Sequence, residues 1–409
     1  MSSKYEEILS MIRKLEELKN KIRGKTILLR TDYNVPLEQK NSKQRIVDDS
    51  RIRASLKTIK FLIKEGARII IISHLGEPKD YDINLSLEIV STKLSRLLKR
   101  KILFCKEVIG EKTDSLVRDF KNNRKQRILM LENLRFNKGE TMNDIDFASR
   151  LASYADYFVF DAFSVAHREH ASVVSIERFL QSYAGYSFYQ ELKNLSNIMI
   201  TSEKPFVLIV GGVKISTKLP FIKNFLDKAD YVLIGGAMMF NFLKAQGFEV
   251  GKSIFSQEEV EIAKQMINSS PNKIIIPKDV VVSKEISKDS GTKISGSEEI
   301  DKDYIGLDIG PKSIEEFKNI LRNARTVVWN GPLGYYEIKR FAKGTEEIAR
   351  FISRLNCKKY ACGGDTLAIV NSLNLKKRFT FVSTAGGAAL EFLSGKELPG
   401  INALISKYN

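Results

Sequence analysis

Cysteine, proline, histidine and long apolar runs are all scarce in this chain of 409 residues. Its three cysteines are too few for a disulfide framework, and their spacing matches no zinc-binding motif. We therefore expect the protein to work in a reducing compartment, the cytoplasm. No run approaches the 18 apolar residues that a membrane-spanning helix needs, and residues 1–24 lack the apolar core of a signal peptide. These absences argue against a membrane protein and against a disulfide-stapled secreted domain.

Acidic residues are outnumbered by basic ones. The chain has 49 Asp and Glu against 66 Lys and Arg, which gives a formal net charge of +17 at pH 7. A surplus of this size favours anionic partners, such as phosphorylated metabolites, nucleotides or nucleic acid. The 43% of apolar residues indicates a globular chain with a sizeable core. The length suggests two or three domains.

Short β-rich runs recur along the chain with almost no alternation between apolar and polar residues. That pattern is typical of strands buried on both faces, as in parallel sheets. The intervening stretches, for example 50–66 and 145–156, are long enough for crossover helices, so the sequence predicts a doubly wound α/β fold. Two Rossmann-like domains, each with a mainly parallel six-stranded sheet flanked by helices, fit the number of runs better than one domain. The runs are 26–29, 68–72, 101–104, 127–131, 157–160, 206–210, 231–234, 273–276, 326–329, 359–362 and 379–383.

Residues 184–200 have helical periodicity, and TSEKP follows them before a new strand. We interpret this stretch as a helix that joins two domains. The predicted division is an N-terminal domain over 1–184, an interdomain helix over 185–203, a C-terminal domain over 204–390 and a tail over 391–409.

The four adjacent glycine pairs all lie in the second half, and each follows a predicted strand. A fifth turn, NGPLG at 330–334, also follows one. In a parallel sheet these turns share the edge beyond the carboxyl ends of the strands, where ligands bind in open α/β folds. Because glycine lets backbone N–H groups approach phosphates, the clustering favours a nucleotide site over simple tight turns. The pairs are Gly211 with Gly212, Gly235 with Gly236, Gly363 with Gly364, and Gly386 with Gly387.

The common nucleotide motifs are absent. No two glycines are spaced i, i+2, which excludes the G-x-G-x-x-G fingerprint. The segment from Gly247 to Ser253 is one residue too short for a Walker A loop, and the protein-kinase motifs are missing. A nucleotide would therefore bind in another way.

Polar and cationic groups follow the predicted strands of the first half, in RTDYN (30–34), SHLGEP (73–78), LENLRF (131–136) and DAFSVAHREH (161–170). Arginines there suit fork-shaped binding of phosphate or carboxylate. These segments also hold the three histidines, which would form a zinc site, donate to an anionic substrate or serve the structure alone. One domain thus suits a small anion and the other a nucleotide. That pairing suggests a group transfer that requires the domains to close.

Long motifs in both halves carry a resemblance. The chain resembles the phosphoglycerate kinase family from end to end, with the motifs in the family's order. The matching segments are RTDYNVPL (30–37), DDSRIRASL (48–56), SHLGEP (73–78), LENLRFNKGE (131–140), DAFSVAHREHAS (161–172), GGVKISTK (211–218), GLDIGPKS (306–313), VVWNGPLGYYE (327–337), FAKGT (341–345), GGDT (363–366) and STAGGAALEFLSGKELPG (383–400).

The resemblance implies a glycolytic and gluconeogenic reaction. Members of the family transfer a phosphoryl group reversibly between MgATP and the carboxylate of 3-phosphoglycerate, giving 1,3-bisphosphoglycerate and MgADP. It implies a hinge-bending monomer whose N-terminal domain binds the acid, whose C-terminal domain binds the nucleotide and whose tail returns to the N-terminal domain. The acceptor is already a carboxylate, so the chemistry needs positioning and charge neutralisation but no general base.

The resemblance implies roles for residues of the N-terminal domain position by position. Arg51 matches the arginine that neutralises the transferred phosphoryl group. Asp32 and Asn34 match contacts to the hydroxyl and carboxylate region of the acid. The other acid-binding positions are Tyr33, His74, Leu75, Gly76, Glu77, Arg135, His167 and Arg168.

In the C-terminal domain, Lys218 matches the lysine that travels with the moving phosphoryl group, and Glu337 the carboxylate that holds the ribose hydroxyls. Asp365 matches the protein ligand to Mg²⁺, an ion that needs few protein ligands. Gly386 and Gly387 match the start of a helix that points at the transferred group, and they are predicted with Arg51 and Lys218 as the catalytic set. The other nucleotide-binding positions are Lys214, Gly235, Gly236, Gly306, Asn330, Pro332, Gly363, Gly364 and Thr366.

Three positions depart from the family pattern. Glu77 stands where the family usually has arginine, so we expect weaker affinity for the acid unless Lys79 substitutes for that arginine. Ala237 and Ala385 each stand in place of a third glycine, and we expect only small backbone adjustments there.

Two other function classes are alternatives. A nucleic-acid-binding protein would fit the positive charge, but the sequence holds no recognised module and its aromatics are not interleaved with basic residues. We expect no specific nucleic-acid partner. A catalytically inactive scaffold would share the fold, but the presence of Arg51, Lys218, Glu337 and Asp365 argues against it.

Overall fold

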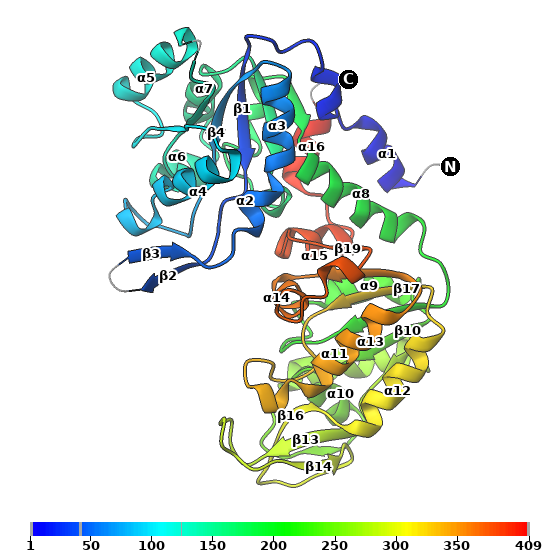
Figure 1. The fold of residues 1–409 in the computed structure, drawn as a ribbon. Helices are drawn as coiled ribbons and strands as arrows, with labels where there is room; N and C mark the ends of the chain where they lie inside the picture. Colours follow the sequence, from blue (N-terminus) through cyan, green and yellow to red (C-terminus); the bar gives the residue numbers. More distant parts are fainter. Residues whose placement is uncertain (1–2, 41–42, 124, 407–409) are drawn as a thin grey trace. The chain divides into compact units, whose positions relative to one another are not determined.

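The computed structural model describes residues 3–40, 43–123 and 125–406. The chain divides into two compact units (Figure 1). Unit 1 comprises Met1–Ser196 with Glu397–Asn409, and unit 2 comprises Asn197–Lys396. The division falls inside helix α8 (Tyr186–Ile200). Each unit therefore has its own core, and the chain returns to unit 1 at its C-terminal end.

Unit 1 is built on a parallel six-stranded sheet with the strand order β5-β6-β4-β1-β7-β8. The middle strand β1 pairs with both β4 and β7, so Leu28 lies opposite Ile70 on one side and Phe158 on the other. The strands are β1 (Thr26–Thr31), β4 (Arg68–Ile72), β5 (Leu103–Phe104), β6 (Ile128–Met130), β7 (Tyr157–Asp161) and β8 (Ser182–Ala184). The strand order is that of a doubly wound fold.

Helices flank this sheet, and an antiparallel hairpin of β2 (Leu37–Lys40) and β3 (Lys43–Ile46) stands apart from it (Figure 1). The predicted helix over 50–66 is two helices that meet at Ser55, whose hydroxyl bonds to the Ile52 carbonyl. The helices are α1 (Lys4–Met11), α2 (Ser50–Ala54), α3 (Leu56–Lys64), α4 (Glu88–Leu98), α5 (Glu111–Asn122), α6 (Lys138–Thr141), α7 (Ile145–Ala152), α8 and α16 (Pro399–Ser406). Short 3₁₀ turns are η1 (Leu15–Leu18), η2 (Ile83–Leu85), η3 (Leu134–Phe136), η4 (Phe163–Val165) and η5 (Ser175–Arg178).

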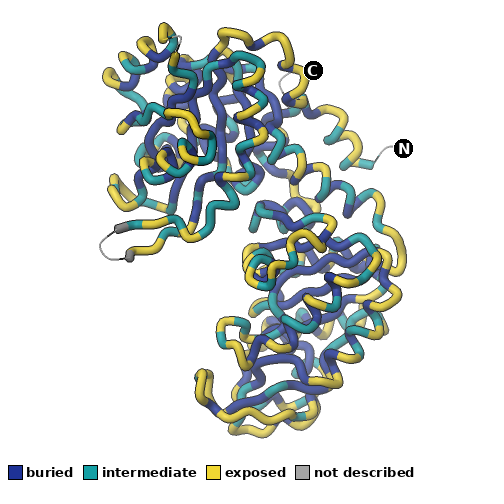
Figure 2. The backbone as a smooth tube through the Cα atoms, in the orientation of Figure 1, coloured by how far each residue is buried: buried dark blue, intermediate teal, exposed yellow. Residues whose placement is uncertain are grey.

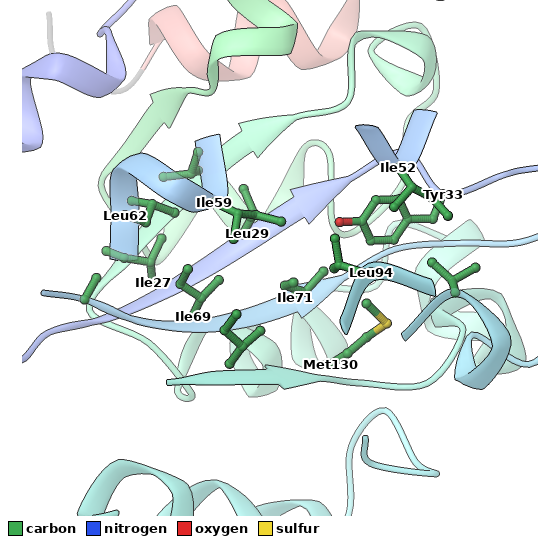
Figure 3. Close-up of a cluster of buried hydrophobic side chains, with 14 of the residues drawn as sticks. Ile27, Leu29, Tyr33, Ile52, Ile59, Leu62, Ile69, Ile71, Leu94 and Met130 are labelled. Carbon is green, nitrogen blue, oxygen red and sulfur yellow. The ribbon is translucent and has the colours of Figure 1, made fainter. Parts of the chain in front are cut away.

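One face of the unit 1 sheet packs against α2, α3 and α4. A cluster of buried hydrophobic side chains fills this layer (Figure 3). It includes every second residue of β1 and β4, namely Ile27, Leu29, Ile69 and Ile71, and each of these is fully buried. Burying side chains of this size contributes roughly 1.5–3 kcal/mol each, which makes the cluster the main stabilising element of this layer. The remaining labelled members are Tyr33, Ile52, Ile59, Leu62, Leu94 and Met130.

Unit 2 repeats the architecture with a parallel six-stranded sheet in the order β12-β10-β9-β17-β18-β19. Its central strands β9 and β17 are buried throughout, and much of the exposed surface lies in the loops and helices around the sheet (Figure 2). The strands are β9 (Phe206–Val210), β10 (Tyr231–Ile234), β12 (Ile274–Ile275), β17 (Thr326–Asn330), β18 (Lys358–Cys362) and β19 (Phe381–Val382). The helices are α9 (Leu219–Leu226), α10 (Met239–Ala245), α11 (Gln257–Ser269), α12 (Pro311–Arg322), α13 (Lys343–Arg354), α14 (Gly364–Ser372) and α15 (Gly387–Leu393), with 3₁₀ turns η6 (Lys339–Phe341) and η7 (Lys376–Arg378). The predicted fold class is thereby confirmed.

Several strands lie outside the runs that the sequence pattern predicts. Unit 2 also holds a three-stranded antiparallel sheet of β14 (Lys293–Gly296), β13 (Asp279–Ser283) and β16 (Ile305–Ile309), and a pair of β11 (Glu249–Val250) with β15 (Glu299–Ile300). β8 is SYA, three residues without an apolar run. Such short strands form because neighbouring backbone groups need partners, which a local pattern does not reveal.

No helix in the described part of the chain has both the length and the apolar character needed to cross a membrane.

Candidate functional site

Predicted acid-binding residues follow four strands of unit 1. Asp32 comes after β1, His74 after β4, Arg135 after β6 and Arg168 after β7. All four strands are parallel, so these residues lie at one edge of the sheet. The fold of unit 1 thus brings together side chains that are up to 136 positions apart, from Asp32 to Arg168.

Asp32 contacts several residues at this edge of the sheet. Its Oδ2 lies 2.7 Å from Nη1 of Arg51, the second residue of α2. The same oxygen accepts a 2.5 Å hydrogen bond from the Ser164 hydroxyl. Its Oδ1 accepts the backbone N–H of Asn34 at 2.9 Å, and the Asn34 side chain accepts the N–H of Gly76 at 2.9 Å. These bonds hold Arg51 in place while its side chain stays 28% exposed.

Two predicted acid-binding residues have their side chains in the core. Tyr33 is fully buried, and its hydroxyl bonds with Ser55 at 2.8 Å; burial is the main cause that raises the pKa of this phenol. Leu75 is buried in the same cluster. Neither side chain reaches the surface, so only the backbone atoms of these two residues are available to a ligand.

His74 is held by a buried arginine that the sequence argument did not single out. Arg30 is fully buried and places Nη2 3.2 Å from Nδ1 of His74, while its Nε donates to Ser172 at 2.9 Å. A guanidinium only donates, so Nδ1 accepts and a neutral imidazole carries its proton on Nε2. Burial, followed by the charges of Arg30 and Arg135, lowers the pKa of His74 well below its usual value. His74 is therefore a neutral donor at pH 7.

Arg30 is in turn paired with the buried carboxylate of Glu140. The guanidinium lies 3.9 Å from a Glu140 oxygen, and that carboxylate also accepts the Ser172 hydroxyl at 2.6 Å. Burial lowers the pKa of Arg30 to about 10, with Glu140 and Asp32 opposing the shift, so Arg30 stays charged at pH 7. The signal in the sequence was the position of Arg30 directly before Asp32, at the end of a buried strand.

Glu77 contacts two of the predicted acid-binding arginines, Arg135 and Arg168. Its Oε1 lies 3.0 Å from Nη2 of Arg168 and 3.5 Å from Nη1 of Arg135, while the side chain of Glu77 is 71% exposed. Arg135 is almost fully buried and also donates to the Gly76 carbonyl at 2.5 Å. The carboxylate of Glu77 therefore occupies two guanidinium groups that would otherwise be available to an anionic ligand.

The other two histidines also belong to this edge. His170 is buried 3.8 Å from Glu140, and burial, then Arg135 and Arg30, lowers its pKa to about 4. His167 is half-buried in the turn after η4. Among the described residues no group of three or more His, Cys, Asp or Glu side chains could hold a metal ion. The zinc interpretation thus has no geometric support in that part of the chain.

A cavity of about 490 Å³ opens at the carboxyl edge of the unit 2 sheet. It is formed by the turns after β9, β10 and β17 together with the start of α14 and residues of β16. Seven predicted nucleotide-binding residues line it: Lys214, Lys218, Gly236, Gly306, Pro332, Glu337 and Asp365. Apolar side chains that the sequence argument missed complete the wall, namely Val213, Met239, Phe240, Ile254, Ile286, Ile305, Leu307 and Tyr335.

Lys218 precedes α9, and its ammonium donates to the Gly211 carbonyl. Burial lowers the pKa of Lys218 to about 8, and Asp365 opposes that shift. The loop before α9 is held from behind by the buried Glu259, whose carboxylate accepts the N–H groups of Ile215 and Ser216. Glu259 was not predicted, since it lies in a helix more than forty residues away.

Two glycines of the cavity leave no space for a side chain. A Cβ on Gly306 would lie 2.3 Å from a ring atom of Phe240. Gly236 has φ +65°, and a Cβ there would lie 2.3 Å from the nitrogen of Gly212. Glycine is therefore required where the turns after β9 and β10 meet.

The remaining predicted residues of unit 2 lie behind or beside the cavity. Asn330 is buried and donates to the Cys362 carbonyl at 2.8 Å, and the Thr366 hydroxyl accepts the N–H of Gly331 at 2.7 Å. Both residues hold the turns after β17 and β18 together. Gly235 directly follows β10, and the pairs Gly363 with Gly364 and Gly386 with Gly387 stand at the N-terminal ends of α14 and α15.

A comparison with known proteins agrees with this arrangement. The family model described as phosphoglycerate kinase matches residues 15–396. This chain belongs to the phosphoglycerate kinase family. The phosphoglycerate kinase of Dictyoglomus turgidum is 44% identical over 390 residues, covering 94% of this chain and 97% of that protein. That of Clostridium botulinum is 42% identical over 393 residues, with the same two coverages.

Solved structures of the family superpose along nearly the whole chain. The phosphoglycerate kinase of Coxiella burnetii matches with a TM-score of 0.83 at 35% identity, covering 95% of this chain and 98% of that one. The enzyme of Pyrococcus horikoshii matches with a TM-score of 0.83 at 30% identity, covering 97% and 99%. The predicted family is thereby confirmed.

Family membership raises the question of a magnesium ion, and Asp365 offers a suitable donor. Its carboxylate lines the cavity beside Lys218, and within the described residues no Lys or Arg forms an ion pair with it. Magnesium takes one or two carboxylates and completes its shell with water and phosphate oxygens. The residues present fit such an ion when it arrives with a nucleotide.

Proposed function

We propose that this phosphoglycerate kinase family member transfers a phosphoryl group reversibly between MgATP and the carboxylate of 3-phosphoglycerate, giving MgADP and 1,3-bisphosphoglycerate. The observation that carries the proposal is the unit 2 cavity, which combines Lys218, Asp365 and close backbone turns at a parallel sheet edge. Backbone N–H groups at such an edge bind phosphates, and a flexible cation neutralises them.

In unit 2, we assign the phosphates to Lys214, Lys218 and the turns at Gly212 and Gly236. The apolar wall around Phe240 would take the flat base, and Glu337 would accept the ribose hydroxyls. Gly235, Gly306, Asn330, Pro332, Gly363, Gly364 and Thr366 shape this cavity from its walls and the turns behind it. Gly386 and Gly387 at the start of α15 are assigned to the transferred group by family resemblance alone.

In unit 1, we assign the acid to the cations at the sheet edge. Arg51 stabilises the charge that spreads over the moving phosphoryl group, Asp32 and Asn34 receive the hydroxyl region, and His74 donates from Nε2. Arg135, His167 and Arg168 bind the remaining anionic end. Tyr33, Leu75 and Gly76 contribute backbone only, and Glu77 competes for the arginines.

The reaction requires no general base, since the attacking carboxylate of the substrate is already ionised. Catalysis then rests on positioning and on neutralising charge, which Arg51 and Lys218 supply. Bound through Asp365, a magnesium ion would neutralise phosphate charge and orient the nucleotide. The predicted domain closure stays a prediction, which small-angle scattering with and without both substrates would test.

We also propose a cytoplasmic monomer. Cys105, Cys357 and Cys362 are all free thiols in this fold, which suits a reducing compartment. Sedimentation equilibrium of the purified chain would test the monomer.

A coupled assay tests the function directly. Purified protein with 3-phosphoglycerate and MgATP should form acyl phosphate, and omission of the acid, of ATP or of Mg²⁺ should each abolish turnover. Turnover without the acid would mean simple ATP hydrolysis. Binding of MgADP without turnover would support the scaffold alternative.

A further inference from the structure

A second cavity in unit 2 lies at the opposite edge of the sheet from the proposed nucleotide site. Its volume is about 670 Å³, and it is formed by the C-terminal end of α13, the start of β18 and the turn η7. Lys359 is the second residue of β18, whereas the nucleotide cavity is lined by residues that follow the ends of β9, β10 and β17. The two cavities share no lining residue.

Cations dominate the lining of this cavity. Five of its nine lining residues are basic and none is acidic: Arg350, Arg354, Lys359, Lys377 and Arg378. Arg350 lies 3.9 Å from Glu346, which is outside the lining. Among the described residues, no carboxylate forms an ion pair with the other four. Like charges gathered in a concave surface raise the local positive potential, so an anion is attracted there.

Lys359 is the strongest sign of a built site. It has a smaller exposed fraction than any other lysine in the described part of the chain, with 8% of its surface exposed. Its ammonium donates to the Leu355 carbonyl at 2.6 Å. An ammonium has three protons to donate, and burial of a charge is costly unless it is paired. An anion in the cavity would add a charged partner to the carbonyl that the ammonium already contacts.

The dipole of α13 explains only part of the cluster. Cations in the last turn of a helix are favoured by its negative C-terminal end, which accounts for Arg354. Arg350, one turn earlier, lies near Glu346. Lys377 and Arg378 come from the short turn η7 and not from α13. Lys359, from β18, donates to the carbonyl of Leu355, the C-cap residue of α13. Three separate segments therefore converge with the same charge.

We propose that this cavity is a second anion site, which binds a compact anion carrying two or more phosphate charges. Guanidinium groups bind phosphate oxygens through paired hydrogen bonds. The lining has no aromatic side chain on which a nucleic-acid base could stack. It also has none of the chain's large exposed apolar side chains, which insertion into a membrane surface would use. A small free polyphosphate fits these features better than a nucleic acid or a lipid surface.

Calorimetric titration with inorganic pyrophosphate tests the proposal on the full-length protein. ADP and 3-phosphoglycerate are kept saturating, metal is omitted and ionic strength is held constant. The wild-type protein should bind one pyrophosphate beyond those ligands. The double variant Arg354→Gln with Arg378→Gln should bind it about tenfold or more weakly, because two charge-assisted hydrogen-bond donors are lost.

The control is a double variant that removes two cations elsewhere in unit 2. Lys264 and Lys312 are exposed and lie outside the cavity, so Lys264→Gln with Lys312→Gln should leave the affinity within about twofold of wild type. If the first pair of substitutions perturbs folding, as seen in the emission of Trp329, Arg350→Gln with Lys377→Gln replaces it. No binding by wild type, or equal losses in both double variants, would overturn the proposal. So would binding of single-stranded DNA or anionic vesicles at this cavity in place of pyrophosphate.

Discussion

At the scale of single residues, Arg51 is the side chain on which the proposed chemistry depends most. It is fixed by a 2.7 Å ion pair with Asp32 yet partly exposed, which suits a cation that must meet a transferring phosphoryl group. We predict that Arg51→Ala lowers kcat about 10³–10⁵-fold, by analogy with arginines that stabilise this transition state. Steady-state kinetics at saturating substrates measure the loss.

Arg51→Lys serves as the control for charge without the fork geometry, and it should retain more activity than alanine. Circular dichroism should show both variants folded. A loss below tenfold in Arg51→Ala would remove Arg51 from the phosphoryl-stabilising role.

Glu77 is the residue that distinguishes the acid site of this chain. Its carboxylate pairs with Arg168 and Arg135, so an anionic substrate has to displace it. Glu77→Gln should therefore lower the KM for 3-phosphoglycerate about two- to fivefold with little change in kcat, the range expected for exposed ion pairs. Glu77→Arg should lower it at least as far. Glu169→Gln, a matched loss of charge on a neighbouring exposed side chain, should not. An unchanged KM in both Glu77 variants would mean that the carboxylate does not compete.

Lys218 predicts how nucleotide affinity depends on pH. Burial holds its pKa at about 8 in the free protein, and bound phosphates would raise it, so binding takes up a proton above pH 8. The affinity for ADP should fall as pH rises through 8, by about tenfold between pH 7.5 and 9.5. Calorimetry in buffers of different ionisation heat would detect the proton uptake. Lys218→Arg keeps its charge and should lose this dependence. An equal slope in both proteins would assign the titration to another group.

At the scale of elements, one buried carboxylate connects a strand to a helix. The N-cap of α12 is Gly310, which has no side chain, and Asp279 from β13 accepts the N–H groups of Lys312 and Ser313 at 3.0 and 2.8 Å instead. We predict that Asp279→Ala lowers the free energy of unfolding of unit 2 by about 2–4 kcal/mol, through loss of a cap and of buried hydrogen bonds. Urea unfolding followed by Trp329, the only tryptophan, would measure it.

Asp279→Asn keeps an acceptor and should cost less than alanine. Asp289→Ala, an exposed aspartate of the same unit, should leave the transition within about 0.5 kcal/mol of wild type. Equal stability of Asp279→Ala and wild type would show that water satisfies the helix end as well as this carboxylate does.

At the scale of the whole molecule, the C-terminal segment of the chain packs into unit 1. Helix α16 places Ile401 in the core of unit 1, and Gly400 donates its N–H to the Ala166 carbonyl at 2.8 Å. Ile401→Ala should destabilise unit 1 by about 2–5 kcal/mol through cavity formation. Hydrogen exchange of unit 1 strands should then speed up, while the urea transition of Trp329 in unit 2 stays in place.

Asn402→Ala, on the exposed side of the same helix, is the matched control and should change neither signal. A shift of the Trp329 transition equal to that of unit 1 would show that the two units unfold as one cooperative body.

The agreement between pattern and structure is closest for the strands. Each of the eleven apolar runs predicted from the sequence overlaps a strand of one of the two sheets, because a parallel strand buried on both faces must be apolar at nearly every position. The sequence pattern did not predict β8 or the antiparallel strands of unit 2. Their short or mixed sequences form strands only because tertiary packing supplies partner strands.

The sequence by itself determined the fold class, the family and which turns meet at each sheet edge. Those depend on local periodicity, on glycine turns and on motif order, which are all linear features. Only the tertiary structure decided that Glu77 pairs with Arg135 and Arg168, that Arg30 sets the tautomer of His74 and that burial lowers the pKa of Lys218. Charge pairing and desolvation depend on distances between residues far apart in the chain, and a linear pattern does not contain those distances.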